Sequence, residues 1–279
     1  MCGAPASLSW PKVALQPRFR DKGDRSMASS WRNVPFFRWS FLRLLFGMKH
    51  LTTEWQVGDG REARLAEYVV ARAKRGDVQD AIRTIDDYAY NKSFLINVGD
   101  EKGKILDAAV VQAKPARVLE VGTYCGYSAL RMAAAAPSAK IVSIEFNPAN
   151  ADIARRIHEH AGVGGRVNVV VGTLGDGGKT IDALRTAYGF GDASVDLVFL
   201  DHAKEVYLSD LKLIMDQGWL RRGALVVADN IKFPGAPDYR AYMAENEGKR
   251  WRSTEHQTVA EYQTVIKDIV LVSEYLGKS

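Results

Sequence analysis

The stretch Arg117–Ser128, RVLEVGTYCGYS, contains an apolar run that leads directly into a glycine turn. Residues 118–121 form the run, and Gly122 and Gly126 mark the turn. A buried strand, a tight turn and a helix N-terminus in this order are typical of the first unit of a doubly wound α/β sheet, where a ligand pocket opens beyond the strand. The stretch therefore predicts an α/β domain whose binding site lies at the carboxyl end of this strand.

The glycine spacing in this turn differs from the dinucleotide-binding fingerprint. G-x-G-x-x-G needs a glycine two residues after Gly122, and that position is Tyr124. The spacing here is G-x-x-x-G, preceded by Glu120, which indicates a ligand without a pyrophosphate; S-adenosylmethionine (SAM) is the common ligand of this kind. Glu145 ends the next apolar run, 25 residues after Glu120, where an acid commonly hydrogen-bonds a ribose hydroxyl.

Apolar strands alternate with amphipathic helices along most of the chain, which predicts a parallel sheet covered on both faces. Two closing strands without a helix between them predict an antiparallel edge, so we expect a Rossmann-like α/β fold with a mostly parallel seven-stranded sheet. The predicted strands are residues 118–121, 140–145, 167–171, 195–201, 224–229, 253–257 and 268–275. The predicted helices are residues 61–75, 78–92, 100–113, 127–135, 150–161, 179–188, 205–215 and 237–246.

Charge is unevenly distributed. Residues 1–50 carry nine Lys and Arg against two acids, a net charge of +7, so the rest of the chain carries −2 of the total of +5. A globular part without excess positive charge argues against nucleic-acid binding. Cys2 and Cys125 lie far apart and indicate neither a disulfide framework nor a zinc site.

The basic N-terminal region contains an aromatic, apolar segment at residues 34–48, interrupted by Arg38 and Arg43. It is shorter than the roughly 20 residues of a membrane-spanning helix. Two interpretations stay open: an amphipathic helix that contacts a membrane surface or targets an organelle, and a helix packed on the domain. Met27 is an alternative start. We therefore expect a cytoplasmic protein, or one that is membrane-associated or organelle-targeted through this segment.

Polar side chains follow the later predicted strands. Asp201 ends VDLVFLD and precedes His202 and Lys204, and Asp229 and Asn230 end ALVVADN. Carboxyl ends of parallel strands share one edge of the sheet, so these groups converge. An acid after a strand is often only a turn or cap residue, but three oxygen donors together suit Mg²⁺ and leave coordination positions open for a substrate.

From about Gly58 to the C-terminus the sequence resembles the animal-type catechol O-methyltransferases. The resemblance divides the chain into an N-terminal extension (1–57) and a catalytic domain (58–279) with a SAM-dependent methyltransferase fold. The motifs are NVGDEKGKI (97–105), LEVGTYCGYSALRMA (119–133), SIEFNP (143–148), VFLDHAKEVYL (198–208) and LVVADNIKFPGAPD (225–238); EHQTVAEYQTVIKDI matches more loosely.

The resemblance implies roles for individual residues, with SAM and Mg²⁺ as cofactors. The implied cofactor-binding residues are Val98, Glu120, Gly122, Tyr124, Ser128, Glu145, Phe146, Leu174, Gly175, Asp201 and His202. The implied Mg²⁺ ligands are Asp201, Asp229 and Asn230, and the implied catalytic residues are Lys204, as general base, and Glu261. The implied substrate-binding residues are Phe94, Ile96, Lys204, Asn230, Pro234 and Glu261.

The implied reaction is Mg²⁺-dependent transfer of a methyl group from SAM to one hydroxyl of a small-molecule catechol. A phenol ionises near pH 10, and chelation by a dication lowers that pKa. A lysine near the cation is pushed towards its neutral form and can take the proton.

Departures from the family affect the substrate slot. Phe94 and Ile96 stand where the family has a Trp and a Met, and Ala203 replaces a Trp. We therefore expect a wider slot and a different catechol preference. Two alternatives remain: methylation of another vicinal-diol aromatic, and a largely non-catalytic accessory role for a membrane partner, as in the transmembrane O-methyltransferase-like branch. We expect a monomer.

Overall fold

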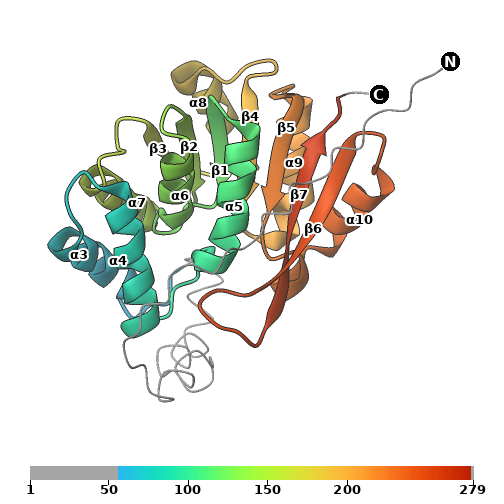
Figure 1. The fold of residues 1–279 in the computed structure, drawn as a ribbon. Coiled ribbons are helices and arrows are strands. Elements are labelled where there is room, and N and C mark those ends of the chain that lie inside the picture. The colour runs from blue at the N-terminus through green and yellow to red at the C-terminus, as the bar shows by residue number, and fades with distance from the viewer. Residues whose placement is uncertain (1–55, 278–279) are drawn as a thin grey trace.

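A seven-stranded sheet forms the centre of the protein in the computed structural model, which describes residues 56–277 (Figure 1). The strand order is β3-β2-β1-β4-β5-β7-β6; β1 to β5 pair in parallel, and β7 is antiparallel to both neighbours. The predicted fold class is confirmed, and the hairpin β6–β7 forms the antiparallel edge, with β6 outermost. The strands are β1 (Arg117–Val121), β2 (Lys140–Glu145), β3 (Val167–Val171), β4 (Val195–Leu200), β5 (Leu220–Ala228), β6 (Trp251–Val259) and β7 (Lys267–Tyr275).

Helices cover both faces of the sheet (Figure 1). The helices are α3 (Arg61–Arg72), α4 (Val78–Asn91), α5 (Gly99–Ala113), α6 (Tyr127–Ala135), α7 (Pro148–His160), α8 (Lys179–Tyr188), α9 (Tyr207–Asp216) and α10 (Pro237–Glu245), with short turns η4 (Lys204–Val206) and η5 (Ile231–Gly235). Side chains alternate across β4: Leu197 and Phe199 join the core under α3 to α6, whereas Val198 and Leu200 join the core under α8 to α10. The parallel strands are therefore buried on both sides.

Some boundaries differ from the sequence-based prediction. The helix expected over residues 205–215 begins as the short turn η4, and α9 starts at Tyr207. Strand β6 is longer than expected, because it is an edge strand with polar side chains on its exposed face and lacks an apolar run to mark its length. The helix expected to end at residue 75 stops at Arg72, since Ala73 is extended.

The strand order reverses between β1 and β4, because β2 and β3 lie on one side of β1 while β4 and β5 lie on the other. Ligands of doubly wound sheets bind at the carboxyl ends of strands at such a switch point. The hairpin β6–β7 extends the same edge, since β6 runs parallel to β5 and its turn lies beyond the carboxyl ends. The fold thus brings the ends of β1, β4, β5 and β6 to one edge.

The predicted segment 34–48 lies outside the described residues, and the domain boundary at residue 58 stays a prediction. Within residues 56–277, no helix is both long enough and apolar enough to span a bilayer.

Candidate active site

The glycine turn after β1 packs backbone against backbone on the end of β4. Gly122 has φ +100°, and a Cβ there would lie 2.4 Å from the carbonyl oxygen of Asp201. Gly126 caps the N-terminus of α6 at φ +85°. The ring of His158 fills the space beside it, and a Cβ at residue 126 would lie 2.3 Å from His158 Nε2. Only glycine fits either position, so the turn that the sequence singled out closes tightly on the switch point.

Glu145, at the end of β2, is tied to the same turn. Its Oε2 accepts hydrogen bonds from the backbone N–H groups of Tyr124 (2.8 Å) and Thr123 (3.2 Å), and Oε1 accepts one from Asn147 N (2.9 Å). Burial raises the pKa of this carboxyl, and the backbone hydrogen bonds oppose that shift. The side chain is thus fixed beside the turn, and its binding of a ligand stays a prediction.

Glu120 is completely buried within β1. Its carboxyl group accepts hydrogen bonds from the hydroxyl groups of Ser128 in α6 and Ser143 in β2. Burial raises its pKa to about 8, and these hydrogen bonds partly offset the effect. Glu120 and Ser128, both predicted in the cofactor site, therefore contact each other directly and join β1, β2 and α6 behind the turn.

The other predicted cofactor-binding residues differ in exposure. Val98 and Leu174 are buried, whereas Phe146 and Gly175 are exposed. His202 is half-buried; its Nε2 lies 2.9 Å from Asp210 Oδ2, and burial lowers its pKa. A neutral His202 ring therefore sits beside the end of β4.

A second group of polar side chains gathers around Lys102 of α5. Its Nζ lies 2.7 Å from Asp229 Oδ2 and 3.3 Å from Asp268 Oδ2, and it also forms an ion pair with Glu261 Oε1. The carboxyl group of Asp229 is fully buried, which raises its pKa to about 8; Lys102 lowers it, whereas Asp201 and Glu261 raise it. We call Lys102, Asp229, Glu261 and Asp268 the acidic cluster.

Asn230 joins this acidic cluster from the residue after Asp229. It has left-handed backbone angles (φ +54°), and its Nδ2 donates to Glu261 Oε1 (3.1 Å) and to Asp268 Oδ2 (3.0 Å). Only the amide NH₂ can donate to two carboxylates, so the carboxylates determine which way the amide lies. The amide oxygen of Asn230 is thereby left for another partner.

Lys204 lies beside Asp201 rather than within the acidic cluster. Its Nζ donates to Asp201 Oδ1 (3.0 Å) and to the hydroxyl oxygen of Tyr207 (2.7 Å), and that hydroxyl donates to Leu200 O (2.8 Å). Burial raises the pKa of Asp201, whereas Lys204 and Lys102 lower it. Lys204 is thus held at the end of β4 by two partners.

The predicted substrate-binding residues lie on segments around the acidic cluster. Phe94 is buried, its carbonyl accepts a hydrogen bond from Arg61 (2.6 Å), and its ring packs edge-on against Tyr262, the neighbour of Glu261. Ile96 is half-buried. Pro234 is exposed in η5 after a cis peptide bond. Phe94 and Pro234 thus come from different segments, and Phe94 lies near the Glu261 loop.

Lys102 and Asp268 are the site residues that sequence analysis missed. Lys102 stands three residues before Ile105 and four before Leu106, on the apolar face of its helix, and a lysine at such a position is the signal that could have found it. Asp268 lies at the start of β7, and only the folded sheet brings it beside Asp229.

Within the described part of the chain, no three His, Cys, Asp or Glu side chains are grouped so as to hold a metal ion. The predicted ligand set, Asp201, Asp229 and Asn230, contains only two carboxylates and an amide. The Nζ of Lys102 lies among the carboxylates of the acidic cluster. Asp201, Asp229 and Asn230 follow β4 and β5 at the same edge of the sheet, and a metal site formed by them stays a prediction.

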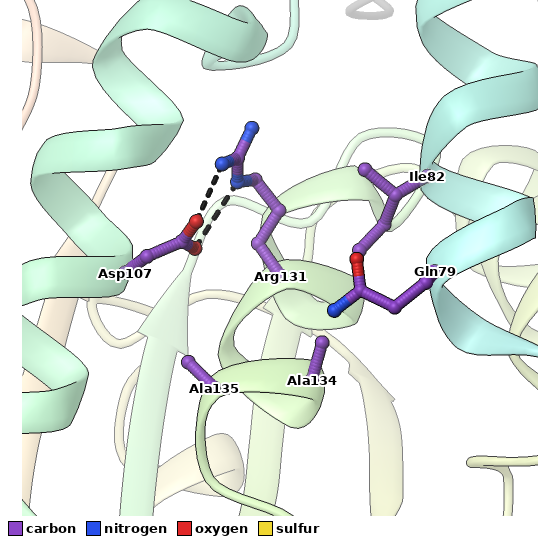
Figure 2. Close-up of a pocket in the computed structure, with 6 residues that line it drawn as sticks. All are labelled: Gln79, Ile82, Asp107, Arg131, Ala134 and Ala135. Atoms are coloured by element: carbon purple, nitrogen blue, oxygen red, sulfur yellow. Dashed lines mark hydrogen bonds and ion pairs between the residues drawn. The ribbon is translucent and has the colours of Figure 1, made fainter. Parts of the chain in front are cut away.

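A pocket lies elsewhere, between α4, α5 and α6 (Figure 2). Arg131 of α6 points towards Asp107 of α5 and pairs with its carboxylate (2.5 Å), beside Gln79 and Ile82 of α4. None of these residues follows the carboxyl end of a strand, so this pocket is separate from the candidate active site.

Comparisons with known proteins place the chain in a family. The model of the O-methyltransferase family matches residues 79–256. The chain is 58% identical over 231 residues to a probable O-methyltransferase of Mycobacterium tuberculosis, covering 83% of this chain and 99% of that protein. It is 41% identical to catechol O-methyltransferase B of Danio rerio, covering 78% and 80% of the two chains. The structure of the O-methyltransferase TomG from Streptomyces achromogenes in complex with SAM matches with a TM-score of 0.56 and 25% identity, covering 70% and 90%. The chain therefore belongs to the O-methyltransferase family.

Proposed function

We propose that the protein transfers a methyl group from SAM to one hydroxyl of a catechol, with Mg²⁺ as a second cofactor. The observation that carries the proposal is the hydrogen bond between Asn230 Nδ2 and Glu261 Oε1 (3.1 Å). It joins a predicted metal ligand to the carboxylate predicted to bind the substrate, from positions 31 residues apart. The identity to a catechol O-methyltransferase supports the same substrate class.

The glycine turn supports SAM as the methyl donor. Glu145 is fixed beside the turn by two backbone N–H groups, where a ribose would present its hydroxyls. TomG, a relative in fold, binds SAM. Gly122 brings the turn against the end of β4, so a cofactor bound over the turn would lie next to Asp201 and His202.

The donor chemistry of the predicted ligands Asp201, Asp229 and Asn230 fits Mg²⁺. Hard oxygen ligands suit this ion, and Asp229 presents a fully buried carboxylate whose Oδ2 lies 2.7 Å from Lys102 Nζ. When all its carboxyl groups are ionised, the acidic cluster carries three negative charges and one positive charge, and the pair Asp201–Lys204 carries one of each sign. Two negative charges would then be uncompensated. A divalent cation carries the matching charge.

The reaction follows from these positions. When bound, Mg²⁺ would lower the pKa of a catechol hydroxyl. Glu261 accepts a hydrogen bond from the second hydroxyl and so fixes the ring. Lys204, whose Nζ lies at the end of β4 beside Asp201, would accept the proton of the attacking hydroxyl. The oxygen then forms a bond to the methyl carbon as the carbon–sulfur bond of SAM breaks, and the sulfonium becomes a neutral thioether. Orientation of the two reactants is worth about 7–11 kcal/mol in such reactions.

The proposal is tested by methyl transfer from labelled SAM to catechol, with Mg²⁺ and with EDTA. Phenol, which lacks the second hydroxyl, is the matched control substrate. We expect a mono-methylated product from catechol with Mg²⁺ only. Product from phenol, or product in EDTA, would contradict the chelating role. No product from several catechols, despite measurable SAM binding, would favour another vicinal diol or an accessory role.

A further inference from the structure

Lys102 is a buried cation that connects one helix to three parts of the sheet. Its side chain is 1% exposed. Its three carboxylate partners come from the end of β5 (Asp229), the β6–β7 turn (Glu261) and the start of β7 (Asp268). A single ammonium therefore holds together segments that lie far apart in the sequence.

We propose that Lys102 is a positioning residue for the candidate active site: it organises the acidic cluster so that Asp229, Asn230 and Glu261 are arranged before a divalent cation binds. This inference rests on the proposed function, which assigns these three residues to the metal and the substrate.

The charges distinguish this role from a simple stabilising ion pair. Burying an ammonium and a carboxylate costs desolvation energy that their attraction often only offsets, so a buried pair is weak evidence for stability. Here one ammonium faces three carboxylates, two of them fully buried. Lys102 therefore assembles the acidic cluster without neutralising it, and the remaining negative charge stays available to a second cation.

Asp268 extends the effect of Lys102 to the turn η5, which carries Pro234. Its Oδ2 lies near Lys102 and accepts a hydrogen bond from Asn230 Nδ2, while its Oδ1 accepts hydrogen bonds from the backbone N–H groups of Lys232 (3.2 Å) and Phe233 (3.0 Å). Both acceptors of the Asn230 amide are thus ion-paired with Lys102. The orientation that leaves the amide oxygen free depends on carboxylates that Lys102 holds.

The neighbouring lysine of the same helix offers a matched control. Lys104 is exposed and pairs only with Glu101, three residues earlier, among its described ion-pair partners. Lys104→Met removes the same charge from α5 without touching the acidic cluster. Lys102→Arg keeps the charge but replaces a compact ammonium by a planar fork.

The experiment compares Mn²⁺ binding, measured by electron paramagnetic resonance as a substitute for Mg²⁺, in the full-length wild type, K102M, K102R and K104M. Loss of a residue that orients metal ligands typically weakens metal binding 10–100-fold, so we expect the Mn²⁺ Kd of K102M to rise about tenfold or more. Simple removal of a positive charge would instead lower that Kd. A lower or unchanged Kd in K102M would overturn the proposal, and K104M is expected to match the wild type.

K102R keeps the test decisive if K102M does not fold. Because the guanidinium cannot take the place of the ammonium, we expect the Mn²⁺ Kd of K102R to rise about threefold or more, and wild-type affinity would overturn the proposal.

A second experiment, without metal, separates the inference from the proposed function. K102M, D268N and the double variant are unfolded with urea in the presence of EDTA. We expect the effect of the double variant on the unfolding equilibrium constant to differ by about tenfold from the product of the two single effects. Multiplicative effects would refute the role of Lys102, whereas absence of Mn²⁺ binding in the wild type would refute the metal in the proposed function.

Discussion

The carbonyl oxygen of Asp201 occupies the space that a side chain at Gly122 would need. A Cβ at residue 122 would lie 2.4 Å from that oxygen, and the backbone there has φ +100°. The contact is between two main chains at the switch point of the sheet, so neither can move aside without disturbing β1 or β4. Packing at the switch point therefore requires a glycine at the first position of the motif.

Gly122→Ala is expected to lower the free energy of unfolding by more than the roughly 1–3 kcal/mol of backbone strain alone, and to weaken SAM binding. Gly178→Ala is the matched control, since φ is +97° and nothing lies within 4 Å of a Cβ there. Urea unfolding and calorimetric titration with SAM measure the two effects. Equal losses of stability in both variants would show that the contact with Asp201 is unimportant.

The buried His158 gives the protein an acid-sensitive support behind the glycine turn. Its Nε2 lies 3.0 Å from Gly126 O, and because a carbonyl only accepts, that nitrogen carries the proton. Burial lowers the pKa of His158 to about 4. The neutral ring is favoured in the fold, so its stabilising effect is complete above the unfolded-state pKa of about 6.5 and is lost as the pH falls towards 4.

His158→Gln removes this titration. Between pH 7 and pH 4, we expect the free energy of unfolding of the wild type to fall by up to about 3 kcal/mol more than that of the variant. Urea unfolding across that pH range measures the difference. At pH 7 the variant is expected to be the less stable of the two. Parallel pH profiles for the two proteins would mean that His158 titrates normally in the fold.

Lys204→Met is expected to lower kcat by about 10²–10⁴-fold, the usual loss on removing a general base, while leaving the Kd for SAM nearly unchanged. Lys212→Met, an exposed lysine of α9 that stacks on Tyr242, is the control. Single-turnover kinetics and calorimetry separate the two quantities. A kcat within about twofold of the wild type would assign the proton to another acceptor.

Much of the fold was predictable because each parallel strand is a short apolar run bounded by turn residues. The predicted strands 140–145 and 167–171 agree with β2 and β3 at both ends. The edge strand β6 was less well predicted, because a strand exposed on one side lacks such a run. In the site, the placement of Glu145 and Asn230 at one edge of the sheet could be predicted, because Glu145 ends a strand and Asn230 follows one. The part played by Lys102 could not, because its partners at residues 229, 261 and 268 meet only through the antiparallel pairing of β7.

Ala203 tests whether the width of the substrate slot sets substrate choice. It is half-buried between His202 and Lys204, where the resemblance to catechol O-methyltransferases expects a tryptophan. Ala203→Trp would add an indole beside Lys204, so we expect kcat/KM for catechol to rise relative to that for a catechol with a bulky ring substituent. A change of about tenfold in this ratio corresponds to the 1–3 kcal/mol that hydrophobic pockets usually discriminate.

Ala203→Leu serves as the graded control, since a smaller side chain should change the ratio in the same direction but less. Competition between the two catechols in one reaction, with products separated by chromatography, measures the ratio directly. If the ratio is the same in the wild type and both variants, residue 203 does not face the substrate. The breadth of the slot would then be attributed to Phe94 and Ile96, the other two positions at which the resemblance expects different residues.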